Sequence, residues 1–358
     1  MGVRHPHTNM SHIRGARVET DGERMIIDAH AHFVPQALID DLVGNKYPAK
    51  SVKVGVENGG VRLAFGGNDA KRPIPRGMET ADARQKWLAA HGIDRQVVGG
   101  WLDMFGYDLP VEEAPDWSRF LNAHMLAATK KLPFFIPLAT VPMQSGNLAA
   151  TILEEALDAG FHGAMIGTQP KGAAGVLDDP DLTPFWEAAS ARKATLFVHP
   201  TFGARDDRLR AYGLVSAVGR VTDTSIAIAR LLYSGHLTRY PGVNLVIAHG
   251  GAALPMMLGR LRQSFATAPA ENSDPMQGFR RLYVDSIVYD ARTVRFIADM
   301  LGPERVLMGT DLPFAIAEGE PIKLIDAAGF SPGERAAILG GTAASLFRVP
   351  VAAAAASA

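Results

Sequence analysis

The sequence predicts an α/β protein in which eight parallel strands form a (β/α)8 barrel. Short β-branched or apolar segments recur eight times between residues 25 and 310. Helical patterns lie between most of them, and neighbouring parallel strands require such crossover connections. A chain of 358 residues is long enough for one large barrel domain.

The predicted elements follow from residue type and from the spacing of apolar side chains. The strand candidates are Met25–His30, Arg95–Trp101, Phe134–Ala139, Gly163–Gly167, Thr195–His199, Asn244–His249, Leu282–Ser286 and Arg305–Thr310. The helix candidates are Ala81–His91, Leu148–Ala159, Thr183–Arg192, Thr224–Ser234, Ala253–Phe265 and Ala291–Leu301.

The connection after the first strand is much longer than a usual strand-to-helix loop. Within residues 33–80, two alternating segments, Ser51–Glu57 and Gly60–Phe65, flank an Asn-Gly-Gly turn that is typical of a hairpin. We therefore predict a small β insertion in a barrel domain of residues 25–348. The polar residues 1–24 predict a mobile extension, and residues 349–358, which are mostly alanine, predict a flexible tail.

Composition disfavours several classes of function. The formal net charge is -1 at pH 7, so no global field attracts nucleic acid or an anionic membrane. The chain has no cysteine, which leaves His, Asp and Glu as metal ligands. It contains no apolar run of about 18 residues and no signal-peptide pattern. We expect a cytoplasmic protein that binds neither nucleic acid nor a membrane.

Histidine and aspartate side chains gather where predicted strands end. His30 and His32 lie at the end of the first strand, and their alternation points them to the same side. His199 ends the fifth strand, His249 ends the sixth, and Asp311 follows the eighth. Each has a structural alternative, such as a hydrogen-bonded histidine or a helix cap. Because these strand ends meet at one face of a barrel, their coincidence favours a metal site.

The same motifs resemble the amidohydrolase superfamily. From Met25 to Phe347 the sequence is similar to the amidohydrolase-related group that contains 2-amino-3-carboxymuconate-6-semialdehyde decarboxylase. The resemblance rests on His30-Ala31-His32, on His199, on His249-Gly250-Gly251 and on Gly309–Phe314.

The resemblance implies one divalent metal ion with His30, His32, His199 and Asp311 as its ligands. His30 favours zinc, because related decarboxylases with Glu at this position often use manganese. Three nitrogens and one carboxylate leave an open coordination position, which a catalytic metal needs. His249 would act as a base or hydrogen-bond partner beside the metal, and we expect both His249 and Asp311 to take part in catalysis.

Two arginines match, in motif and spacing, the carboxylate-binding arginines of that decarboxylase. Arg72 lies in the insertion, and Arg260 lies in the helix after the sixth strand. The resemblance implies that a neighbouring subunit donates Arg260, and hence a homodimer. A guanidinium binds a carboxylate through two hydrogen bonds, although both residues also fit ordinary surface charges. We expect Phe202, Tyr212 and Phe314 to line the substrate pocket.

These residues predict a metal-dependent, non-oxidative decarboxylase that acts on a small unsaturated or aromatic carboxylic acid. The arginines would hold a substrate carboxylate, and His249 would help to protonate the carbon that loses CO2. Hydrolysis of an amide, lactone or carbon–carbon bond by metal-activated water needs the same residues and remains the alternative. A non-catalytic barrel is disfavoured, because buried His and Asp without a metal would be costly.

Overall fold

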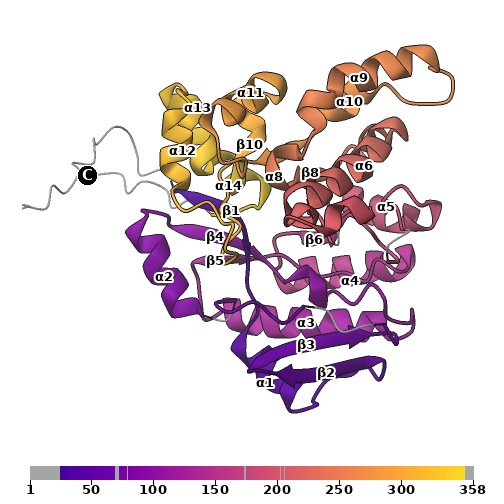
Figure 1. The fold of residues 1–358 in the computed structure, drawn as a ribbon, viewed down its shortest axis with the longest axis vertical. Helices are drawn as coiled ribbons and strands as arrows, with labels where there is room; N and C mark the ends of the chain where they lie inside the picture. Colours follow the sequence, from indigo (N-terminus) through magenta and orange to yellow (C-terminus); the bar gives the residue numbers. More distant parts are fainter. Residues whose placement is uncertain are drawn as a thin grey trace, which may run out of the picture.

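A computed structural model describes residues 25–68, 72–78, 80–172, 175–201, 203–204 and 206–350. Within these ranges, parallel strands form one three-stranded and one five-stranded sheet (Figure 1). The first sheet contains, in spatial order, β1 (Ile27–His32), β4 (Arg95–Gly99) and β5 (Phe135–Pro137). The second contains β10 (Val306–Leu307), β9 (Tyr283–Asp285), β8 (Asn244–Ile247), β7 (Thr195–His199) and β6 (Ala164–Gly167).

Isolated parallel bridges connect the two sheets at both edges. Ala139, just after β5, pairs with Ala164 of β6, and Ala31 of β1 pairs with Leu312, beyond β10. The backbone N–H of His32 also donates to the Leu312 carbonyl at 2.7 Å. Because all these pairings are parallel, the carboxyl ends of the strands lie on the same side of the molecule.

The strands are buried on both faces, as expected for parallel sheets that helices cover. Leu196, Phe197 and Val198 of β7 and Leu245 and Ile247 of β8 are fully buried. Burial of each such side chain contributes about 1.5–3 kcal/mol. The α/β class and all eight predicted strand positions agree with the structure. However, β1 begins and ends two residues later than expected, and β4, β5, β6, β8, β9 and β10 are shorter.

The helices that were predicted form close to their expected bounds. They are α2 (Ala81–Ala90), α4 (Gly146–Ala159), α5 (Thr183–Ala191), α6 (Arg220–Tyr233), α9 (Leu254–Thr267) and α11 (Ala291–Leu301). Further helices, not predicted from the sequence, are α1 (Gln36–Val43), α3 (Ala114–Thr129), α7 (His236–Arg239), α8 (Ala248–Gly251), α10 (Pro275–Phe279), α12 (Pro321–Ala327), α13 (Pro332–Ala336) and α14 (Thr342–Leu346). None of the described helices has the length and apolar character that a membrane span requires.

An antiparallel pair of strands, β2 (Val52–Glu57) and β3 (Gly60–Phe65), lies between β1 and α2 in the chain. Figure 1 shows this pair beside α1, at the bottom of the view. Its inward side chains, including Leu63 and Phe65, pack with Leu42 of α1 and Trp117 of α3 in a second apolar cluster. The predicted extension of residues 1–24 and the tail from Val351 onward lie outside the described residues.

Candidate metal centre

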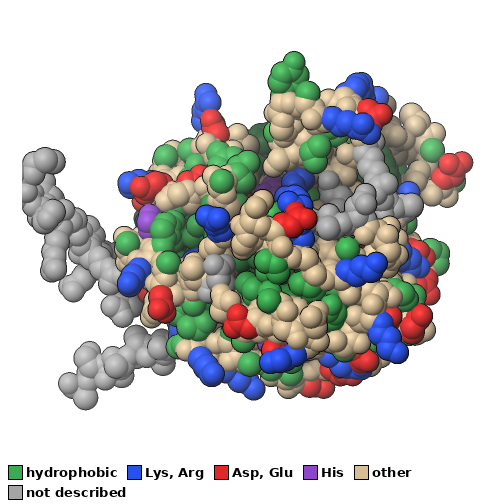
Figure 2. All heavy atoms as spheres, turned by 60° about the horizontal axis from the view of Figure 1, so that its bottom comes forward, with side chains coloured by type: hydrophobic (Ala, Val, Ile, Leu, Met, Phe, Trp, Pro, Cys, Tyr) green, Lys and Arg blue, Asp and Glu red, His purple; other side chains and the backbone are tan. Residues whose placement is uncertain are grey.

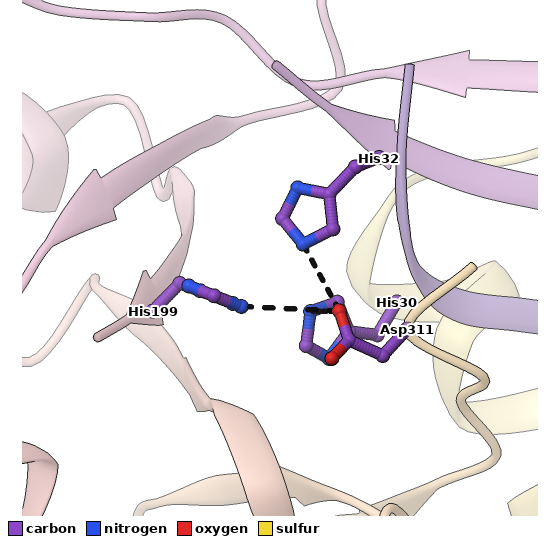
Figure 3. Close-up of side chains that lie close together, drawn as sticks. All are labelled: His30, His32, His199 and Asp311. Atoms are coloured by element: carbon purple, nitrogen blue, oxygen red, sulfur yellow. Dashed lines mark ion pairs between the residues drawn. The ribbon is translucent and has the colours of Figure 1, made fainter. Parts of the chain in front are cut away.

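Four side chains converge at the carboxyl ends of the strands. The ligand atoms offered by His30, His32, His199 and Asp311 all lie within 4.8 Å of one another. Figure 3 shows the imidazoles of His32 and His199 pointing toward the Asp311 carboxylate. Asp311 Oδ1 lies 3.5, 3.2 and 4.0 Å from the Nε2 atoms of His30, His32 and His199, respectively. Two ligands of a tetrahedral zinc ion are about 3.3 Å apart, given bonds of about 2.0–2.1 Å, so these spacings suit a metal.

These four ligand atoms lack protein partners. The Nε2 atoms of the three histidines and Asp311 Oδ1 are buried and have no hydrogen-bond partner among the described residues. A buried polar group without a partner costs about 1–3 kcal/mol. One divalent ion would satisfy all four atoms at once, so the residues fit a bound metal.

The second nitrogen of each histidine fixes the tautomer. The Nδ1 atom of His30 donates to Asp285 Oδ2 at 2.7 Å. The Nδ1 atom of His32 donates to the Gly100 carbonyl, and that of His199 to the Pro200 carbonyl, both at 3.0 Å. Carbonyl and carboxylate oxygens only accept hydrogen bonds, so each Nδ1 must carry the proton. Each Nε2 of a neutral ring therefore presents a lone pair to the centre.

Burial and charge set the protonation of the group. Burial lowers the pKa of His199 well below its ordinary value, and the neighbouring imidazoles reinforce this effect. Burial also lowers the pKa of His32. For His30, the carboxylates of Asp311 and Asp285 outweigh burial and raise the pKa. For Asp311, burial is outweighed by the charge of His30 and by the nearby imidazole of His249, so its pKa lies well below the usual range. An anionic carboxylate beside imidazoles, two of which burial keeps neutral, attracts a cation.

Asp285, at the end of β9, connects the metal centre to the turn that carries His249. It is fully buried, and its Oδ2 accepts from His30 Nδ1 at 2.7 Å and from the His249 N–H at 2.9 Å. Its Oδ1 accepts from the Gly250 and Ile287 N–H groups at 2.8 and 3.1 Å. His249 has a left-handed backbone, with φ of +59°, and these bonds hold it there. From the sequence alone, Asp285 could line the pocket or cap the helix after Tyr289, and its bond to His30 could not be foreseen.

A second buried carboxylate, Asp28, supports the floor of the site. It accepts from the His30 N–H at 3.1 Å, from Gln96 Nε2 at 2.7 Å, and from the N–H and hydroxyl of Thr310 at 3.0 and 2.5 Å. Arg84 lies beneath and donates to Gln96 Oε1 at 2.7 Å. This network joins β1, β4 and the segment after β10, and so fixes the backbones that present His30 and Asp311. Burial raises the pKa of Asp28 despite these bonds.

His249 stands beside the four predicted ligands and is more open than they are. Its Nε2 lies 3.6 Å from Asp311 Oδ2, and its ring centroid lies 5.2 Å from that of His199. The His249 side chain is 17% exposed, whereas the three predicted histidine ligands are almost fully buried. Its position therefore suits contact with a bound substrate.

The structure places one of the predicted substrate residues, Phe314, against this centre, whereas Arg72 is held by another part of the chain. The Phe314 ring lies against His32, with centroids 5.1 Å apart. Arg72 already binds a carboxylate of the chain, because its Nε and Nη2 donate to Asp103 at 2.9 and 3.0 Å. Its guanidinium also lies over the Trp101 ring, 5.6 Å from the centroid. In the face of the molecule that Figure 2 views, histidine atoms (purple) lie at the back of a recess, with Lys and Arg side chains (blue) beside it.

The remaining predicted substrate residues do not meet the centre within one chain. Tyr212 is 95% exposed, so it lines no pocket formed by this chain alone. Arg260 is exposed on α9 and has no ion pair among the described residues. Phe202 lies outside the described residues.

Asp285→Asn should weaken metal binding about 10- to 100-fold. Four N–H donors face Asp285, so the NH2 of an asparagine would oppose at least one of them and release His30. Competition with a chromophoric chelator measures the dissociation constant for zinc. The matched control is Asp290→Asn, because Asp290 caps α11 and pairs with the exposed Arg292, and asparagine caps equally well. Unchanged affinity in Asp285→Asn would contradict the orienting role.

Comparison with known proteins identifies the family of this chain. The family model described as amidohydrolase matches residues 27–349. The 2-amino-3-carboxymuconate-6-semialdehyde decarboxylase of Dictyostelium discoideum is 32% identical over 280 residues, which cover 76% of this chain and 77% of the relative.

Solved structures of decarboxylases share the fold. The 5-carboxyvanillate decarboxylase of Sphingomonas paucimobilis superposes with a TM-score of 0.75 at 22% identity, over 92% of this chain and 100% of the other. The Novosphingobium aromaticivorans enzyme of the same name, complexed with manganese and 4-hydroxy-3-methoxy-5-nitrobenzoic acid, gives 0.73 at 20% identity, over 92% and 98%. The amidohydrolase model that matches residues 27–349 and the 32% identity to the Dictyostelium relative show that this chain belongs to the amidohydrolase family.

Proposed function

We propose that this protein is a metal-dependent, non-oxidative decarboxylase of a small unsaturated or aromatic carboxylic acid. The observation that carries the proposal is the cluster of four unpartnered ligand atoms with His249 beside it. The relative from Dictyostelium and the two structural neighbours described above are all named decarboxylases, which supports this reaction over hydrolysis.

The reaction replaces a carboxylate by a proton: R–COO⁻ + H⁺ gives R–H + CO2. His30, His32, His199 and Asp311 would hold the ion, which when bound supplies Lewis acidity toward substrate oxygens. His249 Nε2 would deliver the proton to the carbon that loses CO2. Asp311, kept anionic by its low pKa, would stabilise the protonated imidazole from its Oδ2 atom at 3.6 Å.

Zinc is the metal we propose, with manganese as the alternative. Three imidazole nitrogens and one carboxylate form a donor set that zinc commonly takes. The manganese in the Novosphingobium neighbour supports the alternative, since that protein has the same fold.

We further propose that eight strands close into a (β/α)8 barrel within residues 25–348 and that the hairpin of β2 and β3 is an insertion. The bridges Ala31–Leu312 and Ala139–Ala164 support closure, because they join the sheets at both edges. The strand pattern of the hairpin, antiparallel and packed on its own apolar cluster, supports the insertion.

For substrate binding, we propose that Arg72 contacts a substrate carboxylate through the N–H groups that Asp103 leaves free. Phe314 would form an apolar wall near the metal, because it lies against His32. Phe202, Tyr212 and a partner's copy of Arg260 would complete the pocket.

A homodimer would account for an exposed apolar surface. Isolated apolar side chains are common on proteins, but several lie together in sequence on α6, on α9 and just before α6. They include Tyr212, Val215, Val218, Ile226, Met256 and Met257. Arg260 follows Met256 by one helical turn on α9, so a second copy seated on this surface would meet its guanidinium.

Met256→Glu should convert a dimer into a monomer, because it places a charge in the proposed interface. Sedimentation equilibrium at micromolar concentration measures the mass. Val56→Glu is the matched control, since Val56 is a comparably exposed side chain on β2, and it should leave the dimer intact. A monomeric wild-type protein, or a Met256→Glu variant that remains dimeric, would refute this interface.

Release of CO2 from a panel of aromatic and unsaturated acids tests the proposed reaction. The zinc-loaded enzyme should release CO2 from at least one of them, and His249→Ala should slow turnover about 100-fold or more, because it removes the proton donor. His91→Ala is the control, since His91 stacks on Trp87 at the end of α2. Turnover of amides or lactones without CO2 release would favour the hydrolase instead.

A further inference from the structure

Arg220, at the start of α6, is a partly buried arginine whose charge no carboxylate pairs with in the described part of the chain. Its one hydrogen bond there is a long one, from Nη1 to the Pro200 carbonyl at 3.4 Å. Its Nε and Nη2 atoms donate to no residue that the structure describes. This contrasts with Arg72, whose guanidinium is fixed by two bonds to Asp103.

Arg220 shares a hydrogen-bond acceptor with His199 of the metal centre. The Pro200 carbonyl that accepts from Arg220 also accepts from His199 Nδ1 at 3.0 Å. The guanidinium and a proposed metal ligand therefore meet at one oxygen atom. Burial lowers the pKa of Arg220, the positive charge of Arg72 lowers it further, and the negative charges of Asp103 and Asp311 oppose this. Asp311 of the metal centre is thus among the charges that act on Arg220.

The carboxylate best placed to neutralise Arg220 is used elsewhere. Asp223 follows Arg220 by three residues on α6 and could face it across one helical turn. Instead, Asp223 Oδ1 accepts from Gln169 Nε2 at 2.7 Å, and its Oδ2 accepts from the Thr168 hydroxyl. These bonds attach α6 to the segment after β6. They occupy both oxygens of the carboxylate that lies nearest to Arg220 along the helix.

Two further polar atoms near this segment are unsatisfied. Gln169 Oε1 and Thr201 Oγ1 are buried and have no hydrogen-bond partner among the described residues. Thr201 directly follows Pro200, the acceptor of the Arg220 bond, and the Gln169 side chain donates to Gly203 and to Asp223 on α6, so both atoms lie on segments that contact Arg220 or its helix. Burying a charge or a polar atom without a partner costs free energy, and a bound ligand that pairs with these groups would offset that cost.

We infer that Arg220 determines substrate specificity by binding a second anionic group, distinct from the carboxylate that leaves as CO2. The inference rests on the proposed function and narrows its substrate to an acid that carries two anionic groups, such as a dicarboxylate. The free edge of the guanidinium, Nε with Nη2, offers the fork that binds a carboxylate in bidentate fashion.

Binding measurements test this role without requiring turnover. Isothermal titration calorimetry of the zinc-loaded protein compares benzoate with phthalate, isophthalate and terephthalate. The wild type should bind at least one of the three dicarboxylates about tenfold or more tightly than benzoate, since a bond to a charged group contributes that much. Arg220→Met should lose this preference while binding benzoate and zinc as the wild type does.

Two further variants sharpen the result. Arg208→Met is the matched control, because Arg208 is an exposed arginine of the same segment whose one ion-pair partner among the described residues is Asp206, and it should keep the preference. Arg220→Lys retains the charge but not the fork, and should keep part of the preference. If circular dichroism shows that Arg220→Met is unfolded, the dicarboxylate preference of Arg220→Lys tests the proposal instead.

Three outcomes would overturn the assignment. They are a wild type without preference for any dicarboxylate, an Arg220→Met variant that keeps the preference, and an equal loss of zinc, benzoate and dicarboxylate binding. The last outcome would make Arg220 a positioning residue that acts on His199 through Pro200. Failure of CO2 release with an intact preference would instead refute the decarboxylase and leave the binding role of Arg220 standing.

Discussion

Four buried lone pairs that point at one another form the constraint on which the site depends. The Nε2 atoms of His30, His32 and His199 and the Oδ1 atom of Asp311 are close together, and none has a hydrogen-bond partner among the described residues. Electron-rich atoms packed so closely repel one another and lose hydration. A cation at their centre reverses both effects, and binding free energy then becomes folding free energy.

The surrounding hydrogen bonds are arranged to keep those lone pairs in place. Acceptors behind each ring fix its tautomer, and Asp285 holds both His30 and the strained backbone of His249. Asp28 fixes the backbones of β1 and of the segment after β10. The two buried carboxylates thus have different roles. Asp285 orients the His30 ring and the His249 turn, and Asp28 joins the neighbouring strands. Loss of either carboxylate would weaken metal binding, although neither belongs to the predicted ligand set.

The sequence predicted the strands and the cluster well, because both follow from local patterns. Apolar runs between turn residues defined the strands, and histidines at their ends defined the site. It could not predict which carboxylate orients the His30 ring, since Asp28 and Asp285 are both strand residues next to the site, and only the contacts in the fold show that Asp285 accepts from Nδ1 and Asp28 from the backbone N–H. Nor could spacing show that Asp103 binds Arg72, or that Gln169 and Thr168 withdraw Asp223 from Arg220. Those pairings depend on contacts between distant segments.

Anomalous diffraction from crystals grown with zinc, recorded on both sides of the zinc absorption edge, tests the central claim most directly. A single strong peak about 2.0–2.2 Å from all four ligand atoms is the predicted result. The account would be contradicted if zinc-soaked crystals showed no peak there, or if the peak lay elsewhere while His30, His32, His199 and Asp311 remained without a common partner.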